Sequence, residues 1–171
     1  MDVRKSVADP AFDAKSNILG LINLLQSAVK NGTRRFIFAS SGGAAYGEQE
    51  TFPATEEHPT HPLSPYGVSK LSSEHYLYYY QKVCGLEYTA LRYGNVYGPR
   101  QDPHGEAGVV AIFAEKLLKG EQPTINGNGM QTRDYVYVKD VIEANMAVMN
   151  RKVNDTFNVG TGIETTVNQL F

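Results

Sequence analysis

The sequence contains 171 residues, of which 42% are hydrophobic, so it is long enough for one domain with its own core. Its 16 Lys and Arg against 18 Asp and Glu give a formal net charge of −2, which excludes a strongly basic protein that binds nucleic acid through charge. No apolar run approaches the roughly 20 residues of a membrane span, and the four histidines show no metal-ligand spacing.

A long helix is the first element that the sequence predicts. Asp9 before Pro10 is typical of a helix N-terminus, where the aspartate caps the chain and proline occupies the first turn. Apolar residues then recur at helical spacing as far as Val29, and Lys30 with Gly32 ends the pattern. We therefore expect a helix from Pro10 to Val29.

A buried strand and a long loop come next. The apolar run 36–39 suits a parallel strand, which the Ser-Ser-Gly-Gly segment 40–43 should end. Residues 47–65 contain four prolines and several acids, a composition typical of a surface loop.

The rest of the chain alternates helices with strands. In chain order we expect a helix over about 66–83, a strand over 88–92, a helix over 109–118, a strand over 133–138, a helix over 140–149 and a short strand over 156–159. Ser64-Pro65 should cap the first of these helices and Gly85 should end it. This alternation is typical of an α/β fold with a parallel sheet.

The single cysteine and three of the histidines have no partner in the sequence that suggests chemistry. Cys84 lies near the end of a predicted helix without a second cysteine nearby, so we expect a buried structural thiol. His58, His61 and His104 lie in proline-rich segments, where we expect solvated side chains.

Tyr66 and Lys70 are the first candidates for chemistry. They stand four residues apart in a predicted helix, so both side chains should lie on one face. A nearby ammonium favours the phenolate and lowers the tyrosine pKa, which suits a general base or acid for a carbinol proton. By itself the spacing also fits an ordinary solvated helix face.

Ser40 and Ser41 add to this interpretation. They follow a predicted strand, and α/β folds place ligands at the carboxyl ends of their strands. Ser, Tyr and Lys together can activate a sugar hydroxyl next to a nicotinamide. Turn chemistry alone would also account for two adjacent serines.

Six segments occur in the order of a known family. They are residues 2–10, Asn17 to Gly20, Ser40 to Gly47, Pro65 to Lys70, Arg92 to Arg100 and Thr132 to Asp140. The chain resembles the extended short-chain dehydrogenase/reductases of the NAD-dependent epimerase/dehydratase family, and most of all their UDP-glucose 4-epimerases. The resemblance covers essentially the whole chain. It implies a partial Rossmann-like parallel sheet flanked by helices, with part of a small substrate-binding domain.

The resemblance implies three catalytic residues. Ser41 would be the catalytic hydroxyl, Tyr66 the base, and Lys70 the residue that holds the nicotinamide ribose. The NAD-binding residues would be Asn17, Ala39, Ser40, Tyr66, Lys70 and Tyr93.

The same resemblance implies a nucleotide-sugar site. Asn95 would hold the substrate near its diphosphate, and Arg133 would neutralise that diphosphate with its planar donor fork. Val109, Thr124 and Asn126 would enclose the uracil.

The implied function is NAD-dependent epimerisation at C4 of a UDP-hexose through a 4-keto intermediate, with the cofactor carrying the redox chemistry. The alternatives are another nucleotide-sugar epimerase or dehydratase, or a catalytically dead remnant that binds a nucleotide sugar or a partner chain. Dehydration needs an acid beside the catalytic hydroxyl, and the neighbours here are Gly42, Gly43 and Ala44. The sequence therefore disfavours dehydration.

The Gly-rich strand–turn–helix that binds the pyrophosphate in such folds has no counterpart in this sequence. We therefore expect residues 1–100 to be the C-terminal half of the NAD-binding Rossmann domain. Residues 101–171 should combine nucleotide-sugar-binding elements with a returning Rossmann strand and helix.

Several expectations about exposure and assembly follow. Strand 36–39 should lie at a sheet edge, and the helix over 10–29 should leave Ile18, Leu21 and Leu25 partly bare. The family implies a homodimer. We expect these residues alone either to self-associate through the edge at Phe36 or to form a loosely packed species, and to bind NAD weakly or not at all. The single cysteine and the lack of a signal-peptide core indicate a cytoplasmic location.

Overall fold

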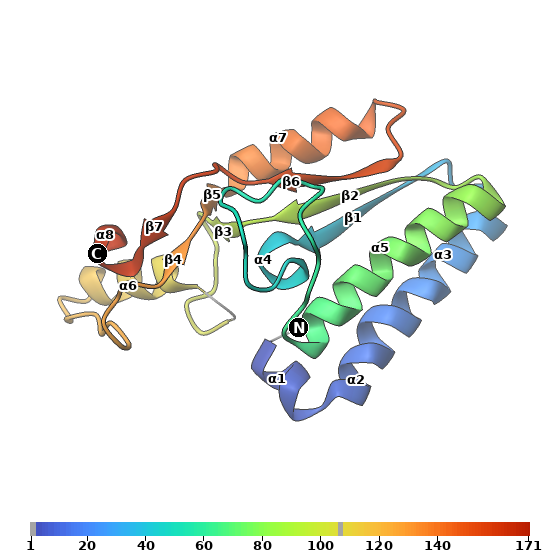
Figure 1. Ribbon diagram of the computed structural model, residues 1–171. Coiled ribbons are helices and arrows are strands. Elements are labelled where there is room, and N and C mark those ends of the chain that lie inside the picture. The colour runs from blue at the N-terminus through green and yellow to red at the C-terminus, as the bar shows by residue number, and fades with distance from the viewer. Residues whose placement is uncertain (1–2, 106–107) are drawn as a thin grey trace.

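A parallel sheet lies at the centre of the chain, whose computed structural model describes residues 3–105 and 108–171 (Figure 1). Three strands form it in the order β1 (Arg35–Ser41), β2 (Glu87–Tyr93) and β6 (Asp155–Val159). Ser41 pairs with Tyr93, and Tyr93 pairs with Val159, so the carboxyl ends of the three strands lie side by side. The predicted α/β class is confirmed, and β1 is an edge strand as expected.

Helices cover both faces of this sheet (Figure 1). One face carries α5 (Pro65–Cys84) and a long helical rod made of α2 (Pro10–Ala14), the π-helical turn η1 (Lys15–Leu19) and α3 (Gly20–Lys30). The opposite face carries α7 (Val138–Met149). The rod confirms the first predicted helix, and Asp9 caps it by accepting from the Phe12 amide at 2.9 Å.

The main hydrophobic core lies between the sheet, α3 and α5. Leu21 and Leu25 are 5% and 0% exposed, because Leu77 and Tyr80 of α5 belong to the same buried cluster. The expectation that these two leucines are partly bare is therefore wrong. Ile18 is half-buried.

The start of α5 is held close to the end of β1. Ser64 Oγ accepts a hydrogen bond from the Gly67 amide at 3.1 Å, so the predicted cap is confirmed. Gly67 lies against α4 (Gly42–Ala45), and a Cβ at this position would collide with the Ala44 carbonyl oxygen. Glycine is thus required here, because it lets the first turn of α5 approach the segment that follows Ser41.

Two strand predictions differ from the structure. Ser40 and Ser41 were expected to end the first strand, but both pair with β2 and α4 begins at Gly42. The predicted strand 133–138 is two short strands, β4 (Thr132–Arg133) and β5 (Tyr135–Tyr137). Asp134 separates them because its carboxylate accepts from the Thr161 and Gly162 amides at 2.9 and 2.8 Å.

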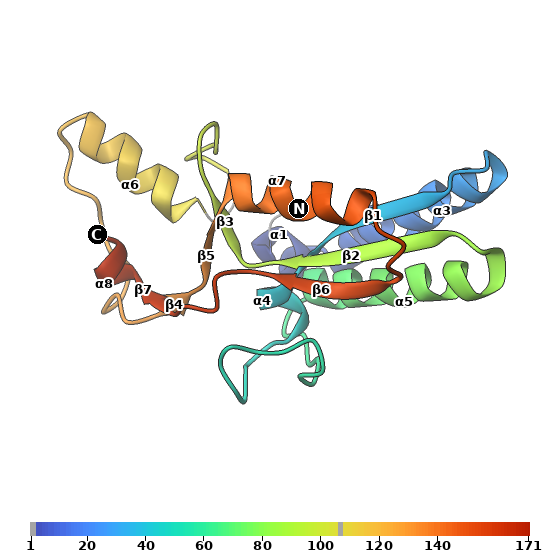
Figure 2. The same cartoon turned by 90° about the horizontal axis from the view of Figure 1, so that it is seen from above.

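The last third of the chain adds a smaller group of elements. β5 pairs with β3 (Asn95–Tyr97), and β4 pairs with β7 (Thr165–Thr166). Together with α6 (Val109–Leu118) and α8 (Val167–Leu170), these strands lie beyond the carboxyl ends of the central sheet (Figure 2). The short helix α1 (Val3–Ala8) was not predicted. In the described ranges, no helix combines the length and apolarity required to cross a membrane.

The burial of two other residues corrects the sequence interpretation. Cys84, the last residue of α5, is exposed, so the expectation of a buried thiol is wrong. His58 is only 8% exposed, because it packs edge-on against Tyr46 and accepts from the Glu50 amide at 2.9 Å. His58 thereby ties the long loop to the body of the protein, whereas His61 and His104 are exposed.

Candidate active site

Three predicted catalytic residues come from neighbouring elements at one edge of the sheet. Ser41 is the last residue of β1 and the residue before α4, and it is partly buried. Tyr66 and Lys70 lie in the first two turns of α5, which runs back along the sheet from the carboxyl ends of its strands (Figure 1). The carboxyl edge of a parallel sheet is where such folds bind ligands.

Lys70 is anchored to the sheet. Its Nζ donates to the Ala39 carbonyl oxygen at 2.8 Å, and it lies 4.7 Å from the centre of the Phe38 ring and 5.6 Å from that of Tyr66. Tyr66 and Lys70 therefore share one helix face, as their spacing predicts. Ala39 contributes its carbonyl group rather than its side chain.

The charge of Lys70 is governed by its surroundings. Burial lowers the pKa of its ammonium, while the carboxylates of Asp13 and Glu74 oppose this shift. Glu74 has its own cation in Arg92, so Asp13 is the carboxylate whose charge is not already paired by an arginine.

Asp13 is a fully buried carboxylate that the sequence analysis did not find. It is 0% exposed, and it accepts from Ser69 Oγ at 2.6 Å and from Asn17 Nδ2 at 2.9 Å. Because a carboxylate only accepts hydrogen bonds, Asp13 fixes which end of the Asn17 amide points toward it. Asn17 lies in the π-helical turn η1, a local irregularity that is frequent at functional sites.

The side chain of Ser40 points into a buried polar cluster. Ser40 Oγ donates to Glu74 Oε1 at 2.6 Å, and Arg92 reaches both oxygens of Glu74 through Nε at 3.0 Å and Nη2 at 2.6 Å. Arg92 Nη1 also donates to the Tyr46 hydroxyl at 2.8 Å. Burial opposes the charge of Arg92, but its hydrogen bonds to Glu74 raise its pKa above the usual value.

Tyr66 and Tyr93 are held from other elements. The Tyr66 amide donates to the hydroxyl of buried Ser6 at 3.2 Å, so α1 contributes to the placement of α5. Tyr93 ends β2, and its hydroxyl lies 2.8 Å from Asn145 Nδ2 of α7. Both rings are partly buried at the same edge of the sheet.

The elements that carry the predicted substrate residues lie beyond the carboxyl ends of the central sheet (Figure 2). Asn95 begins β3, and its amide donates to the Asp134 carbonyl at 2.7 Å. Val109 begins α6 and is half-buried, whereas Thr124 and Asn126 are exposed in the segment after α6. Arg133 in β4 is exposed, with Nη1 donating to the Thr132 carbonyl at 2.6 Å.

A Rossmann-like sheet with a serine, a tyrosine and a lysine at its carboxyl edge defines a protein of the extended short-chain dehydrogenase/reductase class. Within this class, residues 1–160 match the model of the NAD dependent epimerase/dehydratase family, and the chain belongs to that family.

Known relatives agree with this assignment. The UDP-glucose 4-epimerase of Mycolicibacterium smegmatis is 45% identical over 171 residues, which cover 99% of this chain and 55% of that protein. The chain spans about half the length of the curated relatives it matches.

Two solved structures share the fold closely. The UDP-glucose 4-epimerase of Thermotoga maritima with UDP-glucose has a TM-score of 0.95 at 55% identity, over 99% of this chain and 55% of that one. The Thermus thermophilus UDP-glucose 4-epimerase in complex with NAD has a TM-score of 0.91 at 48% identity, over 99% of this chain and 56% of that one.

Proposed function

We propose that the natural gene product containing these residues is an NAD-dependent epimerase that inverts C4 of a UDP-hexose. The observation that carries this proposal is the placement of Lys70, hydrogen-bonded to Ala39 with the Tyr66 ring beside it, at the sheet edge where Ser41 ends β1. The names of the relatives, which include UDP-glucose 4-epimerases, support the choice of reaction and substrate.

The donor set at this edge fits a nicotinamide ribose. An ammonium has three N–H donors, and among the described residues Lys70 uses one for the Ala39 carbonyl, so two remain for ribose hydroxyls. Asn17, Ser40 and Tyr93 would complete the lining, with Ser40 acting through its backbone because its hydroxyl donates to Glu74. NAD would accept the C4 hydride and return it to the opposite face of the sugar.

Residues of this chain would transfer the proton of the sugar 4-hydroxyl. Tyr66 would accept the proton of the 4-hydroxyl as the C4–H bond breaks and return a proton to O4 when that bond forms again. Ser41 would orient the hydroxyl, and the ammonium of Lys70 would favour the phenolate of Tyr66.

The smaller group of elements would hold the nucleotide. Arg133 is exposed and carries a planar donor fork suited to a diphosphate, and Asn95 would lie near the same group. Val109, Thr124 and Asn126 would surround the uracil. In this proposal residues 1–100 belong to the NAD-binding domain, and residues 101–171 supply most of the substrate contacts.

The segment after Ser41 favours epimerisation over dehydration. α4 consists of Gly42, Gly43, Ala44 and Ala45, so the helical turn beside the catalytic hydroxyl carries no carboxylate that could act as the acid. The remaining alternatives are an epimerase that acts on another nucleotide sugar and a catalytically dead protein that binds a nucleotide sugar or a partner chain, and activity assays separate them.

The test is a turnover assay on the purified natural gene product. Interconversion of UDP-glucose and UDP-galactose, followed by proton NMR, should require Tyr66. Absence of turnover in a protein that binds both NAD and UDP would contradict the proposal and favour a binding protein. An absorbance scan for co-purifying NAD(H) provides the complementary check.

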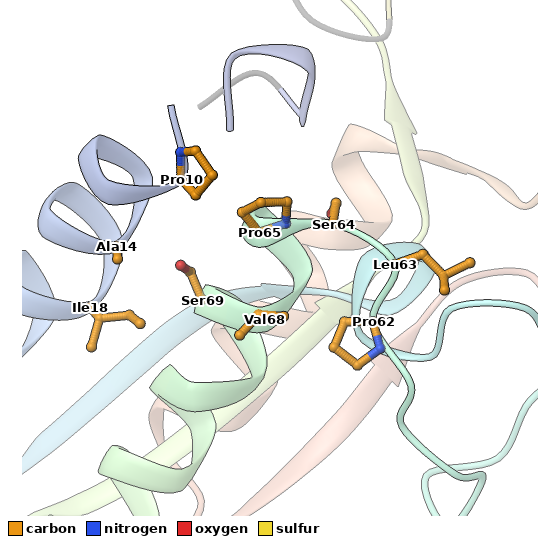
Figure 3. Close-up of a pocket in the computed structure, with 9 residues that line it drawn as sticks. All are labelled: Pro10, Ala14, Ile18, Pro62, Leu63, Ser64, Pro65, Val68 and Ser69. Atoms are coloured by element: carbon orange, nitrogen blue, oxygen red, sulfur yellow. The ribbon is translucent and has the colours of Figure 1, made fainter. Parts of the chain in front are cut away.

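We also propose a cytoplasmic homodimer formed through the exposed face of α5. Val68, Tyr76, Tyr79 and Val83 recur at helical spacing and are all exposed. Beside them lies an apolar groove of about 520 Å³, lined by Pro10, Ala14, Ile18, Pro62, Leu63, Ser64, Pro65, Val68 and Ser69 (Figure 3). Exposed apolar patches of this kind mark interfaces.

Sedimentation of the Tyr79→Glu variant tests this surface. Loss of the dimer is expected, because a carboxylate would be buried in an apolar contact. A dimer that persists in Tyr79→Glu and dissociates in Phe36→Lys would point instead to the edge of β1.

A further inference from the structure

A buried ion pair joins the helix that carries Tyr66 and Lys70 to the middle strand of the sheet. Glu74 and Arg92 are each 7% exposed, and their closest oxygen and nitrogen lie 2.6 Å apart in a two-pronged contact. The pair lies outside the set of residues to which the proposed reaction assigns a role. Its buried charges therefore need a separate explanation.

The cluster around this pair joins four elements, α5, β1, β2 and β6, and Tyr46, the residue after α4. Glu74 of α5 accepts from Ser40 of β1, and Arg92 of β2 donates to the Tyr46 hydroxyl next to α4. That hydroxyl lies 2.7 Å from Asn158 Oδ1 of β6. Glu74 is thus hydrogen-bonded to β1 and β2, and Arg92 is hydrogen-bonded to α5 and to Tyr46, which links it to β6.

The members of the cluster are close in sequence to the proposed active-site residues. Glu74 lies one helical turn after Lys70, and Ser40 comes directly before Ser41. Arg92 comes directly before Tyr93. Any shift of Glu74 against Arg92 or Ser40 would consequently move Lys70 relative to the ends of β1 and β2.

Stability alone is a weak reason for such a pair. Desolvation of two charges offsets most of their attraction, and apolar side chains of similar volume often stabilise a core as well or better. The fork of Arg92, in contrast, permits only a narrow range of geometries with a carboxylate. A buried pair of this type is suited to hold elements in one arrangement.

We propose that Glu74 and Arg92 are positioning residues, which set the placement of Lys70 against the ends of β1 and β2 through the Ser40, Tyr46 and Asn158 contacts. The functional consequence rests on the proposed NAD-dependent reaction. The positioning is a property of the folded protein, so it can be tested without an assay of enzyme activity.

A second ion pair, at the amino ends of β1 and β2, provides a matched control. Arg35 begins β1 and Glu87 begins β2, and their side chains form an ion pair of 2.8 Å. Arg35 also donates to the Val148 carbonyl at 2.6 Å. Both pairs link Arg and Glu across structural elements, but only Glu74–Arg92 lies beside the candidate site.

The experiment compares Glu74→Gln with Glu87→Gln in the natural gene product, at a temperature where both variants are folded. Competitive acetylation followed by peptide mass spectrometry would report the reactivity of Lys70 relative to exposed Lys82 on the same helix. We expect this ratio to rise several-fold in Glu74→Gln and to stay unchanged in Glu87→Gln. NAD affinity and kcat should fall about tenfold or more in Glu74→Gln alone, since small misplacements are costly in catalysis.

Arg92→Lys is the second variant, for the case that Glu74→Gln does not fold. It keeps the positive charge but loses the fork, so we expect the same rise in Lys70 reactivity. A rise in Arg92→Lys, which keeps the charge of Glu74 and its effect on the Lys70 pKa, without epimerase activity in the wild type would support the positioning and reject the proposed function. Unchanged Lys70 reactivity in Arg92→Lys, whatever Glu74→Gln shows, or an equal rise in Glu87→Gln, would overturn the positioning.

Discussion

The two groups of candidate site residues are held in different ways. Around Lys70, buried side chains such as Asp13, Glu74 and Arg92 restrain the candidate residues through hydrogen bonds from several elements. Around Arg133, the candidates are mostly exposed, and its guanidinium donates to the carbonyl of the preceding residue. We call the residues around Lys70, which are proposed to hold the cofactor, the rigid side. We call the residues around Arg133, which are proposed to hold the nucleotide, the open side. Fixed geometry contributes most to catalysis at the atoms where bonds break and form, which explains why the restraints are concentrated around Lys70.

The largest effect is expected from Tyr66→Phe, because it removes the proposed base from the rigid side. We expect kcat of the natural gene product to fall by about 10²–10⁴-fold, the usual contribution of a positioned general base. Tyr78→Phe is the control, since Tyr78 is an exposed tyrosine of the same helix. Wild-type turnover in Tyr66→Phe would remove this residue from the mechanism.

Asp13→Asn should weaken the rigid side next most. The amide can no longer accept from both Ser69 and Asn17, so we expect the free energy of unfolding to fall by about 1–3 kcal/mol. Urea denaturation measures this difference. Asp9→Asn on the same helical rod should be nearly neutral, because Asn caps a helix as well as Asp. Equal losses in the two variants would refute a special restraint at Asp13.

Arg133→Ala tests the open side. We expect UDP binding to weaken by about 2 kcal/mol, as when a charged donor to a phosphate is lost. The free energy of unfolding should change by less than about 0.5 kcal/mol, because the side chain is exposed. Calorimetry with UDP and urea denaturation measure the two quantities. A variant that binds UDP normally would exclude Arg133 from the diphosphate site.

The pH dependence associated with Lys70 is the smallest expected effect. Its pKa is lowered in the folded protein, so in the alkaline range just below the usual lysine pKa the unfolded chain binds more protons. The free energy of unfolding of the wild type should therefore rise with pH in that window relative to Lys70→Met.

Asp13→Asn should lower the pKa of Lys70 further, since it removes an opposing negative charge from α2. Glu74 on α5 remains paired with Arg92 of β2 in that variant. NMR titration of labelled lysine side chains measures the shift. A pKa that rises in Asp13→Asn would contradict the proposed role of this carboxylate.

Local signals were sufficient for the main elements. The caps at Asp9 and Ser64 and the stop at Gly85 marked helices whose bounds the structure reproduces, because capping and left-handed backbone are properties of a few adjacent residues. The spacing of Tyr66 and Lys70 likewise predicted a shared face. Their roles, and those of the other site residues, remain predictions.

Contacts between residues far apart in the sequence determine the buried polar pairs and the burial of His58. Glu74 and Arg92, or Asp13 and Ser69, carry no sign of pairing in the sequence, since their bonds form only when α2, α5 and β2 pack together. The same holds for His58, whose burial depends on Tyr46. Sequence by itself therefore determined the family, the alternation of strands and helices and the candidate residues. The restraint of those residues depends on buried polar contacts, and only the tertiary structure brings the partners within hydrogen-bonding distance.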